Sequence, residues 1–86
     1  MNKRIIQTNQ APTAIGPYSQ AIRIGDFIYT SGQISLDVQS EKFISGEIEE
    51  ETERTIKNIS AILQADGLSL NNVIKTTVYL LDLDHF

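Results

Sequence analysis

The 86-residue sequence contains no cysteine, no tryptophan and a single histidine, His85. The lack of cysteine excludes a disulfide framework, a thiolate nucleophile and a Cys-ligated zinc or iron–sulfur site. One histidine cannot form a histidine cluster, so no metal site is expected. No segment approaches the roughly 18–20 consecutive apolar residues of a membrane helix, and no long apolar stretch follows the basic pair Lys3 and Arg4. These absences indicate a soluble, cytoplasmic protein without a membrane partner.

Basic charge is also scarce, with seven Lys and Arg against eleven Asp and Glu and a net charge of −4. A broad phosphate-binding face is therefore not expected, and nucleic acid is a poor candidate partner. Neither GxGxxG nor GxxxxGK[ST] occurs, so a nucleotide phosphate cradle has no support. The hydrophobic content of 41% is ordinary for a globular chain, and the length predicts one domain over residues 1–86.

The first third of the chain is divided by its prolines and glycines. Lys3–Thr8 is a strand candidate. Both prolines fall in Asn9–Ser19, which predicts a long loop of the kind that often carries function in small domains. Gln20–Ile34 is typical of a β-hairpin, and glycine at the first position of its turn Gly25–Asp26 suits a type II′ conformation.

The clearest helical pattern runs over Glu47–Asp66, where apolar residues recur at three- and four-residue steps and glutamates crowd the first turn. Gly67 suits the left-handed position after a helix, and Leu68 is placed to contact Leu63 as in a Schellman motif. The segment before the helix is polar and turn-like, with Phe43–Ile44 as a brief extended piece.

The last third predicts a strand over Val73–Leu81 that is apolar on both faces apart from Lys75, which indicates burial on two sides. A helix start follows, with Leu83 at the position before the cap and Asp84 as N-cap. The residues that would continue this helix lie beyond Phe86. We therefore expect the domain to be truncated at its C-terminus.

Two short segments are candidates for a functional site. Gly16–Ser19 predicts a rigid bend that presents the hydroxyl of Tyr18 within the long loop, and Thr30–Gln33 places Ser31 and Gly32 inside an otherwise apolar strand. Together they could bind a small polar molecule. The residues leave a structural alternative open for each: a turn whose tyrosine ring caps the core, and a bulge with a satisfied serine hydroxyl.

Three segments in their order identify a family: APTAIGPYSQA at Ala11–Ala21, YTSGQI at Tyr29–Ile34 and VIKTTVYLLDLDHF at Val73–Phe86. On these segments the sequence resembles the RidA (YjgF) family of enamine/imine deaminases over nearly its whole length. The resemblance implies a chorismate-mutase-like α+β fold, with a mixed sheet and two helices packed on one face, assembled as a homotrimer. Neighbouring subunits would then cover the second face of Val73–Leu81. This chain would stop before the second helix and the last strands.

The resemblance also implies an activity: hydrolysis of 2-aminoacrylate and related imines to 2-keto acids and ammonia, without cofactor or metal, in clefts between adjacent chains. Tyr18 matches the loop tyrosine of the family, and Ser31 and Gly32 match its Ser-Gly pair at the substrate pocket. The arginine that binds the substrate carboxylate and the glutamate that positions the water fall beyond Phe86. No catalytic residue is therefore assigned within residues 1–86.

Two other functions stay open. Some members of the family have been called endoribonucleases or translation inhibitors, although the net charge of −4 argues against RNA binding here. A regulatory module that binds a small acid through the same cleft is the other alternative.

Overall fold

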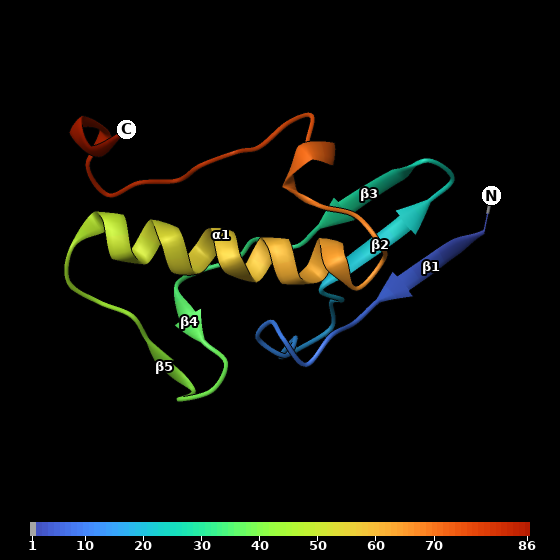
Figure 1. Ribbon diagram of the computed structural model, residues 1–86, viewed down its shortest axis with the longest axis horizontal. Coiled ribbons are helices and arrows are strands. Elements are labelled where there is room, and N and C mark those ends of the chain that lie inside the picture. Colours follow the sequence, from blue (N-terminus) through green and yellow to red (C-terminus); the bar gives the residue numbers. More distant parts are fainter. Residues whose placement is uncertain (1) are drawn as a thin grey trace.

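Three short strands form the larger sheet of the computed structural model, which describes residues 2–86. The strands β1 (Lys3–Ile6), β2 (Ala21–Ile24) and β3 (Phe27–Thr30) pair in the antiparallel order β1-β2-β3 (Figure 1). Ile24 lies opposite Phe27, so the turn between β2 and β3 has two residues, and its first residue Gly25 has a φ of +57°. Positive φ at that position is what a type II′ turn needs, and the predicted hairpin is confirmed.

A two-stranded ribbon precedes the helix. Its strands β4 (Leu36–Asp37) and β5 (Lys42–Phe43) pair antiparallel, with Leu36 opposite Phe43. The backbone N–H of Ile44 donates to the carbonyl of Ser35 at 2.8 Å and extends this pairing by one step. The short extended piece predicted around Phe43 is therefore confirmed.

The helix α1 (Ile48–Gln64) follows, and Glu47 is its N-cap residue. Glu49, Glu50 and Glu51 lie in its first turn, where the helix dipole favours negative charge. At its end the N–H of Leu68 donates to the Leu63 carbonyl at 2.9 Å and the N–H of Gly67 to the Gln64 carbonyl at 3.0 Å. These two bonds and the φ of +78° at Gly67 define the predicted Schellman motif.

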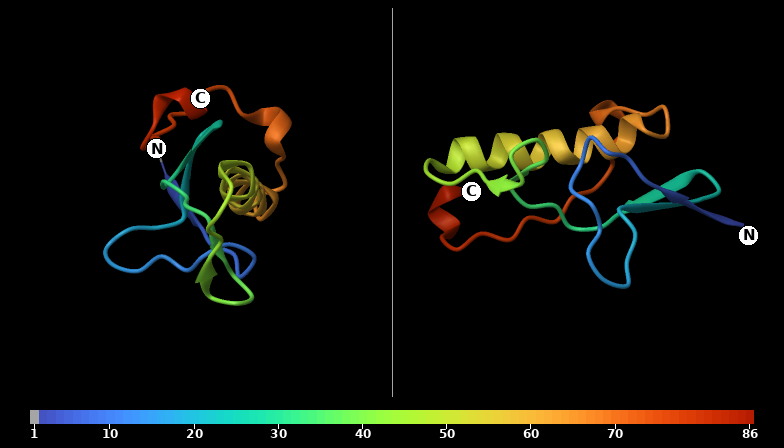
Figure 2. Two further views of the ribbon diagram at one scale, coloured as in Figure 1. Left: turned by 90° about the vertical axis from the view of Figure 1, so that its left-hand side faces the viewer. Right: turned by 90° about the horizontal axis from the view of Figure 1, so that it is seen from below.

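The core lies between α1 and one face of the larger sheet (Figure 2). Ile62 of α1 is fully buried against Ile6 of β1, Ala21 of β2 and Ala11 of the long loop. A core of so few residues stabilises a small domain only modestly. The α+β class is confirmed, but both sheets within residues 2–86 are antiparallel, so the mixed sheet is not found there.

The polar end of α1 is fixed to the larger sheet by one carboxylate. Asp66 lies just past the helix with its side chain only 5% exposed, and it binds the guanidinium groups of Arg4 at 2.5 Å and Arg23 at 2.7 Å. Arg4 and Arg23 are cross-strand partners in β1 and β2, where two like charges would otherwise repel. Hydrogen bonds from Arg23 and Arg4 hold the pKa of the Asp66 carboxyl below its usual range.

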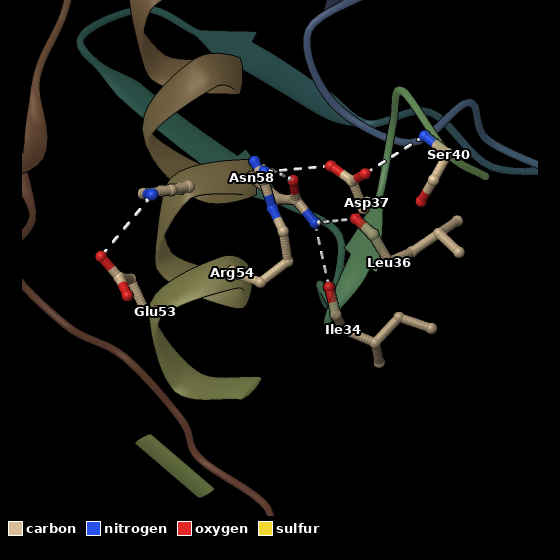
Figure 3. A network of polar contacts seen from close by, with 8 residues as sticks. Ile34, Leu36, Asp37, Ser40, Glu53, Arg54 and Asn58 are labelled. Atoms are coloured by element: carbon tan, nitrogen blue, oxygen red, sulfur yellow. Dashed lines mark hydrogen bonds and ion pairs between the residues drawn. The ribbon is translucent and has the colours of Figure 1, made fainter. Parts of the chain in front are cut away.

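The middle of α1 is fixed to β4 by a buried amide. Asn58 is fully buried and donates to the carbonyls of Ile34 at 3.0 Å and Leu36 at 2.9 Å (Figure 3). The oxygen of the same side-chain amide, Oδ1, accepts a hydrogen bond from the Arg54 guanidinium at 3.0 Å. Arg54 also binds the carboxylate of Asp37 at 3.3 Å. Hydrogen bonds from Ser40 and the charge of Arg54 keep the pKa of Asp37 low.

The strand predicted over Val73–Leu81 is wrong for this structure. The segment leaves a 3-10 turn at Leu70–Asn72 and runs back beside α1 with no strand pairing among residues 2–86 (Figure 1). Its side chains are largely exposed, with Tyr79 at 91%. A strand exists only where a neighbour takes up its backbone hydrogen bonds, so apolar alternation alone could not decide this element.

The predicted helix start at Asp84 is displaced by two residues. A short 3-10 turn at Leu83–His85 has Asp82 as its N-cap, because the Asp82 side chain accepts from the N–H of Asp84 at 2.9 Å. Either aspartate suits a cap by residue type, and the local hydrogen bond selects the earlier one. No helix within residues 2–86 is long and apolar enough to cross a membrane.

Replacement of Asp66 by Asn should lower the urea midpoint of unfolding at pH 7, because Arg4 and Arg23 would face each other without a counter-charge. The folded pKa of Asp66 lies below its unfolded value of about 3.9. Its stabilising contribution is therefore complete above about pH 4 and is lost as the pH falls through the folded pKa. D66N should thus lose less stability than the wild type between pH 7 and pH 3. Equal midpoints at pH 7 for D66N, the wild type and the exposed control D84N would contradict this role.

Replacement of Asn58 by Leu should cost about 2–4 kcal/mol of unfolding free energy, because two backbone carbonyls and Arg54 would lose a buried partner. Urea denaturation measures this cost. The control Gln64→Ala removes an exposed amide of the same helix and should change stability by less than about 0.5 kcal/mol. A similarly small change in unfolding free energy for N58L would show that the hydrogen bonds of Asn58 do not fix α1 to β4.

Candidate functional site

The bend that carries Tyr18 forms as predicted. The N–H of Tyr18 donates to the carbonyl of Gly16 at 2.9 Å, which closes a three-residue turn around Pro17. Gly16 has a φ of +107°, a backbone conformation that residues with a side chain rarely adopt. The Tyr18 side chain is 52% exposed, so its ring does not serve as a cap on the core. The structural alternative for this segment is therefore not supported.

Ser31 lies one residue past the end of β3, not inside the strand as predicted. Its N–H donates to the carbonyl of Gln20 at 2.9 Å, and its hydroxyl donates to the carbonyl of Ser19. β3 ends at Thr30 because its partner strand β2 begins at Ala21, which lies opposite Thr30. The hydroxyl proton is used within the protein, and the oxygen of Ser31 keeps lone pairs that can accept a hydrogen bond from a ligand.

Gly32 is exposed and lies outside the strand as well. Apart from Gly32 itself and its two chain neighbours, no atom of residues 2–86 lies within 4 Å of the position that a Cβ at Gly32 would occupy. Neither a bulge nor a close approach within this chain therefore explains the glycine. Open space beside the backbone leaves room for an external group at this point.

The segments that carry the three predicted site residues are joined at one end of the larger sheet. Ser31 is hydrogen-bonded to Ser19 and Gln20, the two residues that follow Tyr18 in the chain, and Gly32 follows Ser31. This end of the sheet offers a phenolic hydroxyl, a serine oxygen and exposed backbone. Groups of this kind can orient a small polar molecule and a water.

The residue that joins these parts is Gln20, which sequence reasoning missed. The residue is 3% exposed, and its amide makes four hydrogen bonds to backbone groups: two to Thr8, just before the long loop, and one each to Ala11 and Pro12 within it. The sequence shows only a polar residue before the apolar start of β2. Its place depends on the pairing of Ile6 with Ala21, which puts Gln20 where the β1–β2 ladder stops, and no local pattern in the sequence indicates that pairing.

Arg23 and Lys75, two basic side chains of the kind that can bind a substrate carboxylate, make their contacts elsewhere. Arg23 binds Asp66 at 2.7 Å and the carbonyl of Gly25 at 3.1 Å. Lys75 lies in the exposed segment after α1, where its ammonium is 3.4 Å from the hydroxyl oxygen of Thr77. Neither is held by a contact with the residues around Tyr18 and Ser31. Within residues 2–86 no three His, Cys, Asp or Glu side chains are grouped so as to hold a metal ion.

Two open clefts lie away from this end of the sheet. The larger, about 470 Å³, is formed by one face of α1 and the C-terminal turn, and is lined by Ile48, Glu49, Thr52, Glu53, Ile56, Lys57 and His85. The smaller, about 260 Å³, is lined by Asn9, Gln10, Asp37, Val38, Gln39 and Arg54. Tyr18, Ser31 and Gly32 line neither cleft. The candidate site is thus an exposed surface within this single chain.

A family model and several curated proteins match this chain over nearly its whole length. The family model described as Endoribonuclease L-PSP matches residues 8–86. A RutC family protein of Pyrococcus abyssi is 52% identical over 86 residues, which are all of this chain and 68% of the relative. The human 2-iminobutanoate/2-iminopropanoate deaminase is 48% identical over 84 residues, which are 98% of this chain and 61% of the relative.

Solved structures agree with the sequence matches. The crystal structure of the YjgF gene product of E. coli superposes with a TM-score of 0.89 at 36% identity, over 94% of this chain and 63% of that one. The chain thus spans about two thirds of the length of the proteins it matches. Fold, motifs and sequence identity agree over nearly all of it, and the chain belongs to the RidA/YjgF family that the Endoribonuclease L-PSP model describes.

Proposed function

We propose that the protein is an enamine/imine deaminase, which hydrolyses 2-aminoacrylate and related imines to 2-keto acids and ammonia. The observation that carries the proposal is that Ser31 is hydrogen-bonded to Ser19 and Gln20, the residues that directly follow Tyr18, at one end of the sheet. The deaminase names of relatives with nearly half of their matched residues identical support the same chemistry.

The reaction needs little beyond water and proton transfer. 2-Aminoacrylate tautomerises to 2-iminopropanoate, water adds across the C=N bond, and the resulting carbinolamine loses ammonia as its C–N bond breaks and the carbonyl forms. The task of the site is to hold the imine and the water in line and to move protons between oxygen and nitrogen. The Tyr18 hydroxyl is proposed to donate to the substrate, while the Ser31 oxygen accepts a hydrogen bond from the water or the imine N–H.

A group that binds the substrate carboxylate is proposed to come from outside the surface formed by residues 2–86. Arg23 is already bound to Asp66, and the resemblance implies an arginine and a glutamate beyond Phe86. The uncovered apolar side chains of Val73–Leu81 support the proposal that neighbouring chains of a homotrimer pack against this segment. The protein would then act on a small imine in the cytoplasm, in clefts between chains.

Variants of the two hydroxyl residues test this proposal. 2-Aminoacrylate generated in the assay should yield pyruvate and ammonia faster with the purified full-length protein than in buffer. Tyr18→Phe and Ser31→Ala should each lower kcat/KM about tenfold or more, since each removes one hydrogen bond to the reacting groups, worth about 1.4 kcal/mol per factor of ten.

The matched control is Ser45→Ala, which alters an exposed serine in the segment between β5 and α1 and should keep the wild-type rate. No acceleration over buffer by the full-length wild-type protein, with Tyr18 and Ser31 intact, would refute the deaminase proposal. If the protein then bound a keto acid without turnover, the regulatory module would be favoured. Cleavage of RNA that persists in Y18F and S31A would favour the ribonuclease alternative.

A further inference from the structure

The β1–β2 ladder stops at an unusual place. Its last backbone pair is Ile6 with Ala21, so the next pair in register would be Gln7 with Gln20. Instead, the side-chain amide of Gln20 binds the peptide of Thr8 at two points: the N–H of Thr8 donates to Oε1 at 2.7 Å, and Nε2 donates to the Thr8 carbonyl at 3.1 Å. The amide thus takes the role of a strand neighbour at the point where the backbone leaves the sheet.

The same amide also holds the first part of the long loop. Nε2 of Gln20 lies 3.2 Å from the carbonyl oxygen of Ala11 and 2.7 Å from that of Pro12, and it donates to both. Its two hydrogens are therefore shared among three acceptors. Because the side chain is buried, water cannot replace these bonds when the amide is removed. Gln20 closes the base of a loop whose ends are adjacent in space, as in an Ω-loop.

The backbone of Gln20 acts on the other half of the candidate site. Its carbonyl accepts the N–H of Ser31 at 2.9 Å, and the carbonyl of the preceding Ser19 accepts the Ser31 hydroxyl. Tyr18 lies two residues before Gln20 and is half exposed, so core packing does not fix its ring. The position of the Tyr18 hydroxyl relative to Ser31 depends on the closed base of the loop.

We propose that Gln20 is a positioning residue: its buried amide and its carbonyl together set the relative placement of Tyr18 and Ser31. The consequence for catalysis rests on the proposed deaminase function. A displacement of about 1 Å between groups that must act together can lower a rate by about two orders of magnitude. Loss of the amide should therefore affect turnover more than it affects the stability of the fold.

The chain offers a matched control for this test. Gln20 and Asn58 are the two buried residues within residues 2–86 whose side chains are amides, and both use that amide to bind backbone carbonyls. Asn58 joins α1 to β4 and makes no bond to the loop or to Ser31. Gln20→Met and Asn58→Leu both replace a buried amide by an apolar side chain, so a purely structural role predicts similar effects for the two.

The first experiment is kinetic, at a temperature where both variants are folded. Gln20→Met should lower kcat for the hydrolysis of 2-iminopropanoate at least tenfold, whereas Asn58→Leu should stay within twofold of the wild type. Equal losses in the two variants would overturn the positioning role. If the wild type itself shows no turnover, the deaminase proposal fails, and the second experiment decides the positioning role independently.

The second experiment uses amide hydrogen exchange and the Tyr18 ring signals in solution NMR. The side-chain amide protons of Gln20 and the N–H of Thr8 should exchange at least tenfold more slowly in the wild type than the side-chain amide protons of exposed Gln39. In Gln20→Met the Tyr18 ring signals should shift, and in Asn58→Leu they should not. If the side-chain amide protons of Gln20 in the wild type exchange as fast as those of Gln39, the proposal is overturned, even if Gln20→Met does not fold.

Discussion

One stripe of α1 and the turn after it hold the two sheets of this protein together. Asn58, Ile62 and Asp66 follow one another at four-residue steps, so they lie on the same side of the helix. Each makes a different kind of contact: Asn58 binds the carbonyls beside β4, Ile62 packs in the core, and Asp66 binds arginines of β1 and β2. Because the apolar core is small, the placement of β1 and β2, and with them the larger sheet that carries the candidate site, depends on Ile62 and Asp66. Asn58 instead fixes α1 to the chain around β4.

The candidate site lies where the larger sheet ends and the long loop begins. The ladder stops at Ala21, and the chain on either side of that point carries Tyr18 in the loop and Ser31 after β3. Gln20 makes the transition possible, because its amide satisfies backbone groups that would otherwise be buried without partners. The most exposed polar groups of the site are thus supported by one of the most buried polar side chains. Such support is typical of sites that need precise placement with little packing around them.

Local patterns predicted the elements whose causes are local. The hairpin at Gly25, the helix over most of Glu47–Asp66 and the stop at Gly67 each follow from conformational preference and short-range hydrogen bonds. The family could be read from three ordered segments, and the candidate residues Tyr18, Ser31 and Gly32 lie within two of these segments. Long-range effects could not be read in the same way. The role of Gln20 depends on bonds between residues 8 to 12 positions apart, and the state of Val73–Leu81 depends on whether a neighbouring strand is present.

The central claim is that small keto acids bind at the sheet end formed by Tyr18, Ser31 and Gly32, and not in the larger cleft along α1. The most direct measurement is a titration of the isotope-labelled protein with 2-ketobutanoate, followed residue by residue through amide chemical shifts. The account predicts saturable shifts that are largest at Tyr18, Ser31 and Gly32. Shifts that cluster instead around Thr52, Ile56 and His85, which line the cleft on α1, would contradict it.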